Sequence, residues 1–227
     1  MEAFLNEDAI STVENLMSIR GYLNGQELAS AFRMLRPNSL IWHYFVHRYL
    51  YGESMPALNV SFWNMDYTRL PRAMHSFYLR EFYLRNKLVK KNGVTLGGHA
   101  LDLSLVEQPL YAVGTHEDHI APWRATFRTA SLVRGPVRYV LSSSGHIFGI
   151  INPPVQPPKR EYWVGDATHE LDAKAWRARQ TKLSGSWWED WVAWLDQHCG
   201  PFHSASPVGS SAHRKLCAAP GTYVYET

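Results

Sequence analysis

Two short apolar segments in the second half of the chain each end in a cluster of polar residues. The first is YAVGTHEDHIAPW, in which Asp118 and His119 follow the apolar run, and the second is RYVLSSSGHIFGIINPP, in which His146 follows it. A run of this kind is typical of a buried strand whose end opens onto a loop, which is where α/β folds place their chemistry. The pattern predicts a carboxylate and a histidine at two strand ends, and a nucleophile would be the third member of the set.

From about residue 101 the sequence alternates between strand and helix patterns. We expect strands in 107–115 and 137–145, helices in 121–135 and 184–200, and a proline-rich loop in 151–163. The apolar faces of the two helices are Phe127, Ala130, Ser131 and Val133 in the first and Trp187, Trp188, Trp191, Trp194 and Leu195 in the second. This alternation favours a parallel sheet covered by helices. Two strands cannot bury both faces of a sheet or protect its edges, so we expect a piece of a larger sheet.

The first hundred residues are expected to form a small helical subdomain. Helices are predicted in 6–21, 24–37, 38–52 and 69–88. Their ends carry recognisable signals, because Asn24 can cap a helix, Gly21 and Pro37 can end one, and Pro71 suits a first turn. The aromatic stretch 57–71 between them is expected to be irregular. We therefore divide the chain into a helical part (1–100), a strand-and-helix part (101–200) and a loose tail (201–227).

Composition excludes several classes of protein. The chain has 227 residues, of which 45% are hydrophobic and 19% charged, which is typical of a globular protein. The net charge is only +3 with both signs mixed along the chain, so no nucleic-acid partner is expected. No window offers the roughly 18 apolar residues of a membrane span, and the first ten residues are acidic where a signal peptide is basic, so we expect a cytoplasmic protein.

The nucleophile is the missing part of the pattern. Asp118 after one strand and His146 after the next is the order in which an α/β-hydrolase presents the last two members of its triad. The sequence contains no Gly-x-Ser-x-Gly or Gly-x-Cys-x-Gly turn before them. Cys199 and Cys217 both follow His146, so they are expected to be an inert small residue and a tail thiol.

Several long motifs resemble those of one enzyme family. They are GYLNGQELASAFRMLRPNSLIW, FWNMDYTRLP, MHSFYLREFYLRN, EDHIAPW, SSSGHIFGIINPP and GSWWEDW. Together they resemble polyhydroxyalkanoate synthases of class I, which make poly(3-hydroxybutyrate), in register from about Phe4 to Trp194. The resemblance implies the C-terminal portion of such a synthase, comprising an inserted helical cap and the end of an α/β-hydrolase core, with the Gly-x-Cys-x-Gly turn lying N-terminal to it.

The resemblance also implies a reaction. A cysteine thiolate accepts the acyl group of a 3-hydroxyacyl-CoA, and a polyester chain grows with release of CoA. His146 would activate the cysteine, and Asp118 would orient His146 or help deprotonate the 3-hydroxyl. The resemblance implies no cofactor. It implies short acyl chains as substrates and a homodimer. A chain without its nucleophile is expected to be inactive alone. The alternative is a non-catalytic interaction module that binds a complete synthase or the polymer granule surface.

Each candidate residue also has a simpler explanation. Asp118 can cap the helix that follows it, and His146 can be an ordinary loop histidine. His119 is expected to support its loop, and Trp63 to lie either in the core or at a surface that meets a partner subunit. The tryptophans of 187–194 are expected to pack rather than to bind polymer. No metal site is expected, because the spacing of His116, His119, His146 and His169 fits no common ligand pattern.

Overall fold

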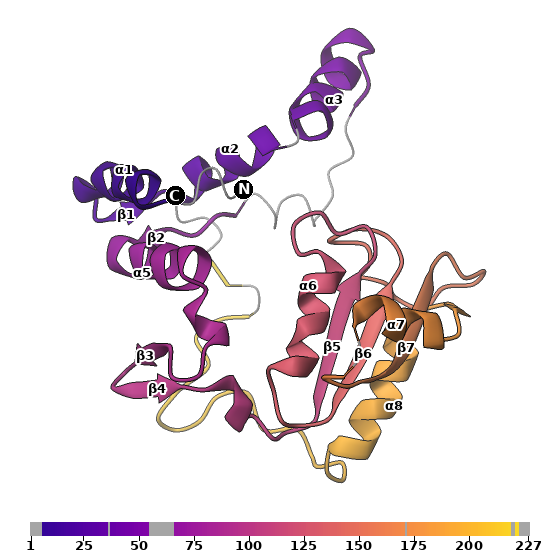
Figure 1. Cartoon of the computed structure of the whole chain (residues 1–227). Helices are drawn as coiled ribbons and strands as arrows, with labels where there is room; N and C mark the ends of the chain where they lie inside the picture. The colour runs from indigo at the N-terminus through magenta and orange to yellow at the C-terminus, as the bar shows by residue number, and fades with distance from the viewer. Residues whose placement is uncertain (1–5, 36, 55–65, 171, 219–220, 223–227) are drawn as a thin grey trace. The chain divides into compact units, whose positions relative to one another are not determined.

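The computed structural model describes residues 6–35, 37–54, 66–170, 172–218 and 221–222. The chain is a mixture of helices and small sheets (Figure 1). It divides into two compact units, one of residues 1–86 with 206–227 and the other of residues 87–205. The three-part division drawn from the sequence stays a prediction.

The first unit is mainly helical, as its sequence predicts. Its elements are α1 (Glu7–Ser18), β1 (Tyr22–Leu23), α2 (Gly25–Leu35), π-helical turns at Asn38–Trp42 and Val46–Leu50 around α3 (His43–Phe45), β2 (Leu70–Pro71), α5 (Arg72–Phe77) and a π-helical run Tyr78–Leu84. The predicted cap at Asn24 forms, since its side chain accepts a hydrogen bond from the Gln26 N–H, and Asn6 likewise caps α1 by accepting one from the Ala9 N–H. The two-residue pairing of β1 with β2 was not foreseen. Most of the aromatic stretch 57–71 lies outside the described residues.

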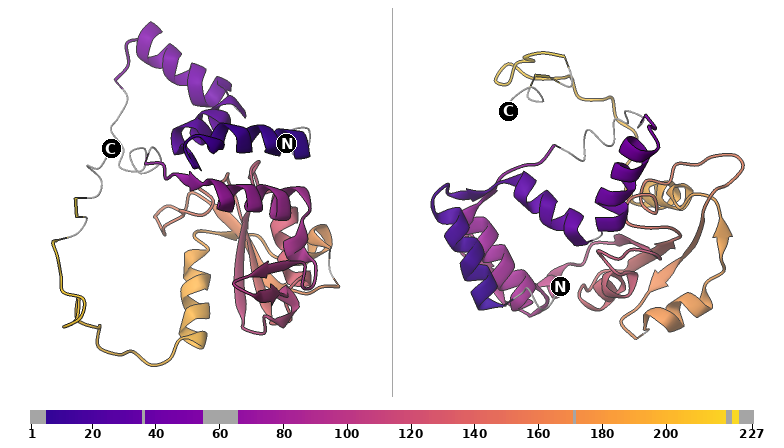
Figure 2. Two further views of the ribbon diagram at one scale, coloured as in Figure 1. Left: turned by 90° about the vertical axis from the view of Figure 1, so that its left-hand side faces the viewer. Right: turned by 90° about the horizontal axis from the view of Figure 1, so that it is seen from above.

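Helices α1 and α5 lie side by side in this unit (Figure 2). Arg80, in the run that continues α5, donates hydrogen bonds to Glu7 at 2.7 Å and to both carboxylate oxygens of Glu14 at 2.7 and 3.0 Å. The bidentate contact fixes α1 against the α5 run by geometry as well as charge. Ile10 and Met17, both on α1, are buried in the core of the unit.

The second unit is built on a four-stranded sheet with the order β5-β6-β7-β8. The strands are β5 (Leu110–Thr115), β6 (Val137–Ser142), β7 (Glu161–Ala167) and β8 (Leu183–Ser184), and the main helices are α6 (Trp123–Phe127), α7 (Ala173–Arg179) and α8 (Trp188–His198). A hairpin of β3 (Val94–Leu96) with β4 (His99–Leu101) precedes the sheet. Short 3-10 turns lie at Lys87–Val89, Leu103–Leu105 and Arg128–Ser131.

The expected parallel sheet is only partly correct. β5 and β6 are parallel, whereas β7 runs antiparallel to β6, and β8 runs antiparallel to β7. The start of β7 lies in the predicted proline-rich loop, so the sequence predicts two strands where this sheet has four. The helix expected in 121–135 is shorter than predicted, since it becomes a 3-10 turn after Phe127.

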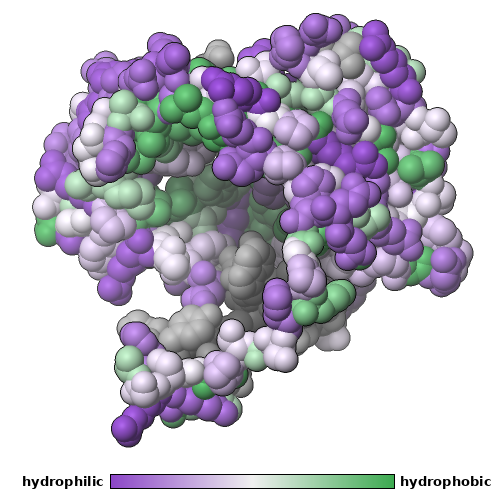
Figure 3. All heavy atoms as spheres, turned by 90° about the horizontal axis from the view of Figure 1, so that it is seen from below, coloured by the Kyte–Doolittle hydropathy of each residue, from purple (hydrophilic) through white to green (hydrophobic). Residues whose placement is uncertain are grey.

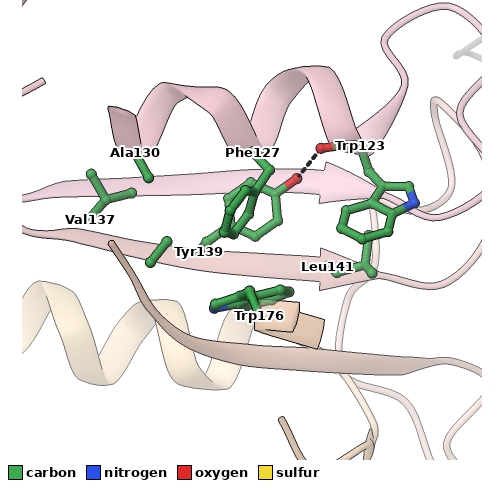
Figure 4. Packing of buried hydrophobic residues seen from close by; sticks show 8 residues of the cluster. Trp123, Phe127, Ala130, Val137, Tyr139, Leu141 and Trp176 are labelled. Carbon is green, nitrogen blue, oxygen red and sulfur yellow. Dashed lines mark hydrogen bonds between the residues drawn. The ribbon is translucent and has the colours of Figure 1, made fainter. Parts of the chain in front are cut away.

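Alternate residues of β6 enter two separate cores, one on each face of the sheet. On the first face, Tyr139 and Leu141 pack with Phe127 of α6 and Trp176 of α7, and the Tyr139 hydroxyl donates to the Trp123 carbonyl at 3.0 Å (Figure 4). On the second face, Val140 packs with Trp187 at the start of α8. Of the inner residues expected in the helix over 121–135, Phe127 and Ala130 are buried, whereas Ser131 is exposed. The helices thus cover both faces of the sheet.

The surface carries scattered apolar side chains. On the face shown in Figure 3, hydrophobic residues are interspersed with hydrophilic ones. No helix among the described residues combines the length and apolar character needed to cross a membrane.

Candidate active site

The two loops that carry Asp118 and His146 start at the same edge of the sheet. The last residues of the parallel pair β5 and β6, Thr115 and Ser142, are register partners. The chain continues the pairing beyond both strands, because the His116 N–H donates to the Ser142 carbonyl at 2.8 Å and the Glu117 N–H donates to the Ser144 carbonyl at 3.0 Å. The two polar clusters therefore meet at the carboxyl ends of neighbouring parallel strands.

Asp118 is held in a tight turn after β5. Its Oδ1 atom accepts hydrogen bonds from the backbone N–H groups of Ile120 and Ala121, both at 2.8 Å. Its Oδ2 atom accepts the Thr115 hydroxyl at 3.3 Å. Asp118 thus orders the turn before α6, which is part of the helix-capping role considered for it. Its Oδ2 atom stays directed toward the neighbouring loop.

His146 completes the pair. Its Nδ1 atom lies 2.8 Å from Asp118 Oδ2, and the Asp118 side chain is 7% exposed while that of His146 is 46% exposed. Because an ionised carboxylate can only accept, Nδ1 carries the proton, and Nε2 is left as an acceptor. Nε2 has no hydrogen-bond partner among the residues that the structure describes. The imidazole therefore presents Nε2, an acceptor nitrogen, away from Asp118.

The carboxylate of the pair is kept ionised. Burial opposes ionisation of Asp118, but hydrogen bonds from the Ala121 N–H, from His146 and from the Ile120 N–H outweigh it and lower the pKa of Asp118 below its ordinary value. A charged, nearly buried carboxylate beside an exposed imidazole is suited to fix the ring orientation and to stabilise an imidazolium.

The loop after β6 approaches the end of β5 too closely for a side chain at one position. A Cβ atom on Gly149 would lie 2.4 Å from Cγ2 of Thr115, so only glycine fits there. The segment from Gly145 to Ile151 forms a helical turn, with hydrogen bonds from the Gly149 N–H to the Gly145 carbonyl and from the Ile151 N–H to the Ile147 carbonyl. This close approach brings the His146 loop onto Thr115, next to Asp118.

The start of α8 holds the other side of the His146 loop. The indole N–H of Trp187 donates to the Gly149 carbonyl and that of Trp188 donates to the Ile150 carbonyl, both at 3.0 Å. The Ser186 hydroxyl donates to the Asn152 carbonyl and accepts the Trp188 N–H at 3.1 Å. The sequence predicts that these tryptophans pack, but it does not reveal that two of them bind the loop that carries His146. Only their position directly after Ser186 could have indicated a shared role.

The other histidines do not gather with His146 into a metal site. His116 Nε2 accepts a hydrogen bond from Arg177 at 2.9 Å, across 61 positions of sequence. In the part of the chain that the structure describes, no group of three or more His, Cys, Asp or Glu side chains is placed to hold a metal ion. Trp63 lies outside the described residues.

Neither cysteine lies in the site just described. Both are free and exposed. Cys199 follows the last residue of α8, about 16 Å along that helix from the end that binds the His146 loop. Cys217 belongs to the first unit. The contacts described here therefore join a carboxylate and an imidazole, and the prediction that Cys199 and Cys217 are not nucleophiles stays a prediction.

Comparison with known proteins identifies relatives of the chain. No protein-family model matches it. The chain is 42% identical over 99% of its length to the poly(3-hydroxyalkanoate) polymerase subunit PhaC of Rhizobium meliloti, and 42% identical over 99% to the poly(3-hydroxyalkanoate) polymerase of Methylorubrum extorquens. It is 41% identical over 89% to the corresponding subunit of Cupriavidus necator. The matches span 36%, 37% and 34% of those proteins, about a third of their length. The resemblance predicted from the motifs is confirmed.

Proposed function

We propose that this chain, which is homologous to about a third of the length of poly(3-hydroxyalkanoate) polymerases, supplies the acid and the base of their acyltransferase site. The observation that carries the proposal is the 2.8 Å contact between His146 Nδ1 and Asp118 Oδ2 at the ends of two parallel strands. In this account the chain is the C-terminal part of an α/β-hydrolase core with its helical cap, and a cysteine outside the chain is the nucleophile.

The proposed reaction follows from the orientation of the imidazole. Nε2 of His146 takes the proton of the cysteine thiol, and the thiolate attacks the thioester carbonyl of a 3-hydroxyacyl-CoA. The C–S bond to CoA breaks, the imidazolium returns its proton to the CoA thiolate, and the acyl group remains on the cysteine. Transfer of the growing polyester to a 3-hydroxyl then extends the chain. Asp118 holds the ring and stabilises the imidazolium, and the chemistry requires no cofactor.

The open edge of the sheet supports the proposal that another polypeptide segment completes the fold. Among the residues that the structure describes, β5 pairs with β6 on one side only, and it is a six-residue strand without charge or proline. Edge strands of this kind are normally paired or covered. A parallel strand added there would end beside Asp118, where the nucleophile is needed. Poly(3-hydroxybutyrate) as product, a homodimer and granule association rest on the resemblance, and a cytoplasmic location rests on the sequence pattern.

The test is reconstitution of CoA release. The chain alone is expected to release no CoA from 3-hydroxybutyryl-CoA. Mixed with the part of the Rhizobium meliloti polymerase that the chain does not match, it is expected to release CoA, measured with a thiol reagent. His146→Ala is expected to lower the rate by about 10³-fold or more, because the general base is lost.

The matched control is His203→Ala, which removes an exposed histidine distant in sequence from the site and should leave the rate unchanged. A reconstituted rate that His146→Ala leaves intact would contradict the proposal. Tight binding to a complete polymerase with no effect of His146→Ala on any rate would instead favour the interaction module.

A further inference from the structure

A cavity on the face of the sheet covered by α6 and α7 is lined by cations and indole rings. Its volume is about 410 Å³, and its lining consists of Trp123, Arg124, Trp163, Lys174, Arg177 and Ala178. This set contains three positive side chains, two tryptophans and no carboxylate. We call it the cationic cavity.

Two of the three cations of this cavity, Arg124 and Arg177, lie over indole rings. The guanidinium carbon of Arg177 lies 4.4 Å from the centre of the Trp163 ring, while Nη1 donates to His116 Nε2 at 2.9 Å. The guanidinium carbon of Arg124 lies 5.8 Å from the centre of the Trp123 ring. Among the described residues, none of Arg124, Lys174 and Arg177 forms an ion pair with a carboxylate. Their positive charge is therefore available to an anion.

A second cavity extends the first. Its volume is about 340 Å³, and it shares Arg124 and Lys174 with the cationic cavity. It adds Arg128, His169 and one carboxylate, Asp172, which accepts the backbone N–H of Lys174 at 2.7 Å. The carboxylate makes this second cavity less favourable for an anion than the cationic cavity, which has none.

The cationic cavity lies beside the proposed reaction site and not in it. Arg177 contacts His116, which directly follows Thr115, and the Thr115 hydroxyl donates to Asp118. None of the residues lining the cavity comes from the His146 loop. The cavity could therefore hold a non-reacting part of a ligand next to Asp118 and His146.

We propose that the cationic cavity binds the nucleotide end of the CoA thioester substrate. This inference rests on the proposed function. The nucleotide carries a pyrophosphate, a 3′-phosphate and an adenine ring, so it combines multiple negative charges with a flat aromatic group. Guanidinium groups bind phosphate oxygens through paired N–H donors, and indole rings provide stacking surfaces. A volume of about 410 Å³ is in the range of pockets that hold small ligands.

Binding to the purified chain tests this without requiring turnover. Coenzyme A, pantetheine and inorganic pyrophosphate are titrated into the chain by calorimetry. Coenzyme A is expected to bind, pantetheine to bind at least about tenfold more weakly, and pyrophosphate to bind more weakly than coenzyme A. Lys174→Gln and Arg124→Gln should each raise the dissociation constant of coenzyme A about fivefold, with an affinity that falls as salt is added.

Lys159→Gln is the matched control, because it removes one exposed lysine of the same unit that lies outside both cavities. It should change the dissociation constant by less than about twofold. Equal affinity for pantetheine and coenzyme A, equal affinity for pyrophosphate and coenzyme A, or equal losses in Lys159→Gln and Lys174→Gln would each overturn the assignment. Normal coenzyme A binding together with failed reconstitution would contradict the acyltransferase proposal and leave the cavity assignment standing.

Discussion

Asp118 shows how one side chain can serve a turn and a site at once. Oδ1 accepts two backbone N–H groups, which orders the chain before α6, and Oδ2 meets His146. The two oxygens therefore divide the structural and the chemical role between them. The cap-like explanation and the catalytic one, which are alternatives in the sequence, are compatible in the structure.

Replacing Asp118 with asparagine separates these roles. Asp118→Asn keeps an oxygen for the backbone N–H groups but removes the charge that fixes the protonated Nδ1 of His146. In the reconstituted enzyme we expect CoA release to fall by about 10²-fold to 10⁴-fold with the thermal midpoint of the chain nearly unchanged. The check is the low-field proton signal of the His146 Nδ1–H, which should disappear in the variant. A full rate with asparagine would show that the carboxylate is only structural.

Asp118 and His146 could be predicted because each follows an apolar run directly, and parallel strand ends meet at one edge of a sheet. The contact between His116 and Arg177 could not be predicted in the same way. It joins residues 61 positions apart, and Arg177 lies on a seven-residue helix with no pattern distinct from a solvated basic segment. Pairings of this kind depend on how β7 and α7 fold back over the sheet.

At the scale of elements, α8 is the support of the His146 loop. Its first turn supplies two indole N–H donors to the loop, and Asp190 in the same helix accepts hydrogen bonds from Arg138 at 2.9 Å and from the Tyr111 hydroxyl at 2.8 Å. Burial raises the pKa of Tyr111, with Asp190 acting in the same direction, so the hydroxyl remains a donor. The helix is thus fixed to β5 and β6 while it holds the loop between Ser142 and Glu161.

Removing one of these indole donors should loosen the loop. Trp188→Phe keeps a ring but leaves the Ile150 carbonyl without its donor, at an expected cost of about 1 kcal/mol in the free energy of unfolding. We expect faster amide exchange in residues 146–151 and a lower rate of CoA release in the reconstituted enzyme. Trp191→Phe, three positions after Trp188 on the same helix, is the matched control. Equal exchange in both variants would mean that Trp188 does not hold the loop.

The contact between α1 and the α5 run should depend on pH. The hydrogen bond from Arg80 is the main cause that lowers the pKa of Glu14 from 4.5 to about 2, with a further bond from Ser76. Because the folded value is depressed, the stabilisation is fully present above about pH 4.5 and is lost as the pH falls through about 2. The protection of the α1 amides, measured relative to their intrinsic exchange rates at each pH, should therefore fall over this range. In Glu14→Gln the pH dependence should be weaker, and an identical profile would contradict the assignment.

Elements with strong local signals were predictable and weaker ones were not. Caps at Asn6 and Asn24 start helices where the sequence places them. β7 was not predicted, because it follows a proline-rich segment and contains Gly165 and Asp166, which interrupt its apolar pattern. It is stabilised by pairing with β6 rather than by its own sequence, which is why its residues alone do not identify it.

For the molecule as a whole, the open edge of β5 decides what the chain can do alone. Even-numbered residues of β5 direct their N–H groups toward β6, as Leu110 does toward Pro136 and His116 does just beyond the strand toward Ser142. By alternation, the N–H and C=O groups of Tyr111 and Val113 face the open edge. This edge is a template for one more strand.

Blocking the edge tests that conclusion. Val113→Pro removes an N–H group on the open side without removing a hydrogen bond to β6. Edge strands accept proline at positions whose N–H faces outward. We expect the purified chain to self-associate in sedimentation experiments and Val113→Pro to be less associated and to fail in reconstitution. Ala112→Pro, which breaks the pairing with β6, should instead unfold the sheet. Unimpaired reconstitution by Val113→Pro would mean that no strand joins this edge.

The most direct test of the central claim is the reactivity of the proposed cysteine. In the reconstituted enzyme at pH 7, iodoacetamide should alkylate the cysteine of the Gly-x-Cys-x-Gly turn at least about tenfold faster with His146 present than in His146→Ala, because the imidazole draws the proton from the thiol. Equal alkylation rates in the two proteins would contradict the claim that Asp118 and His146 activate a thiol supplied from outside this chain.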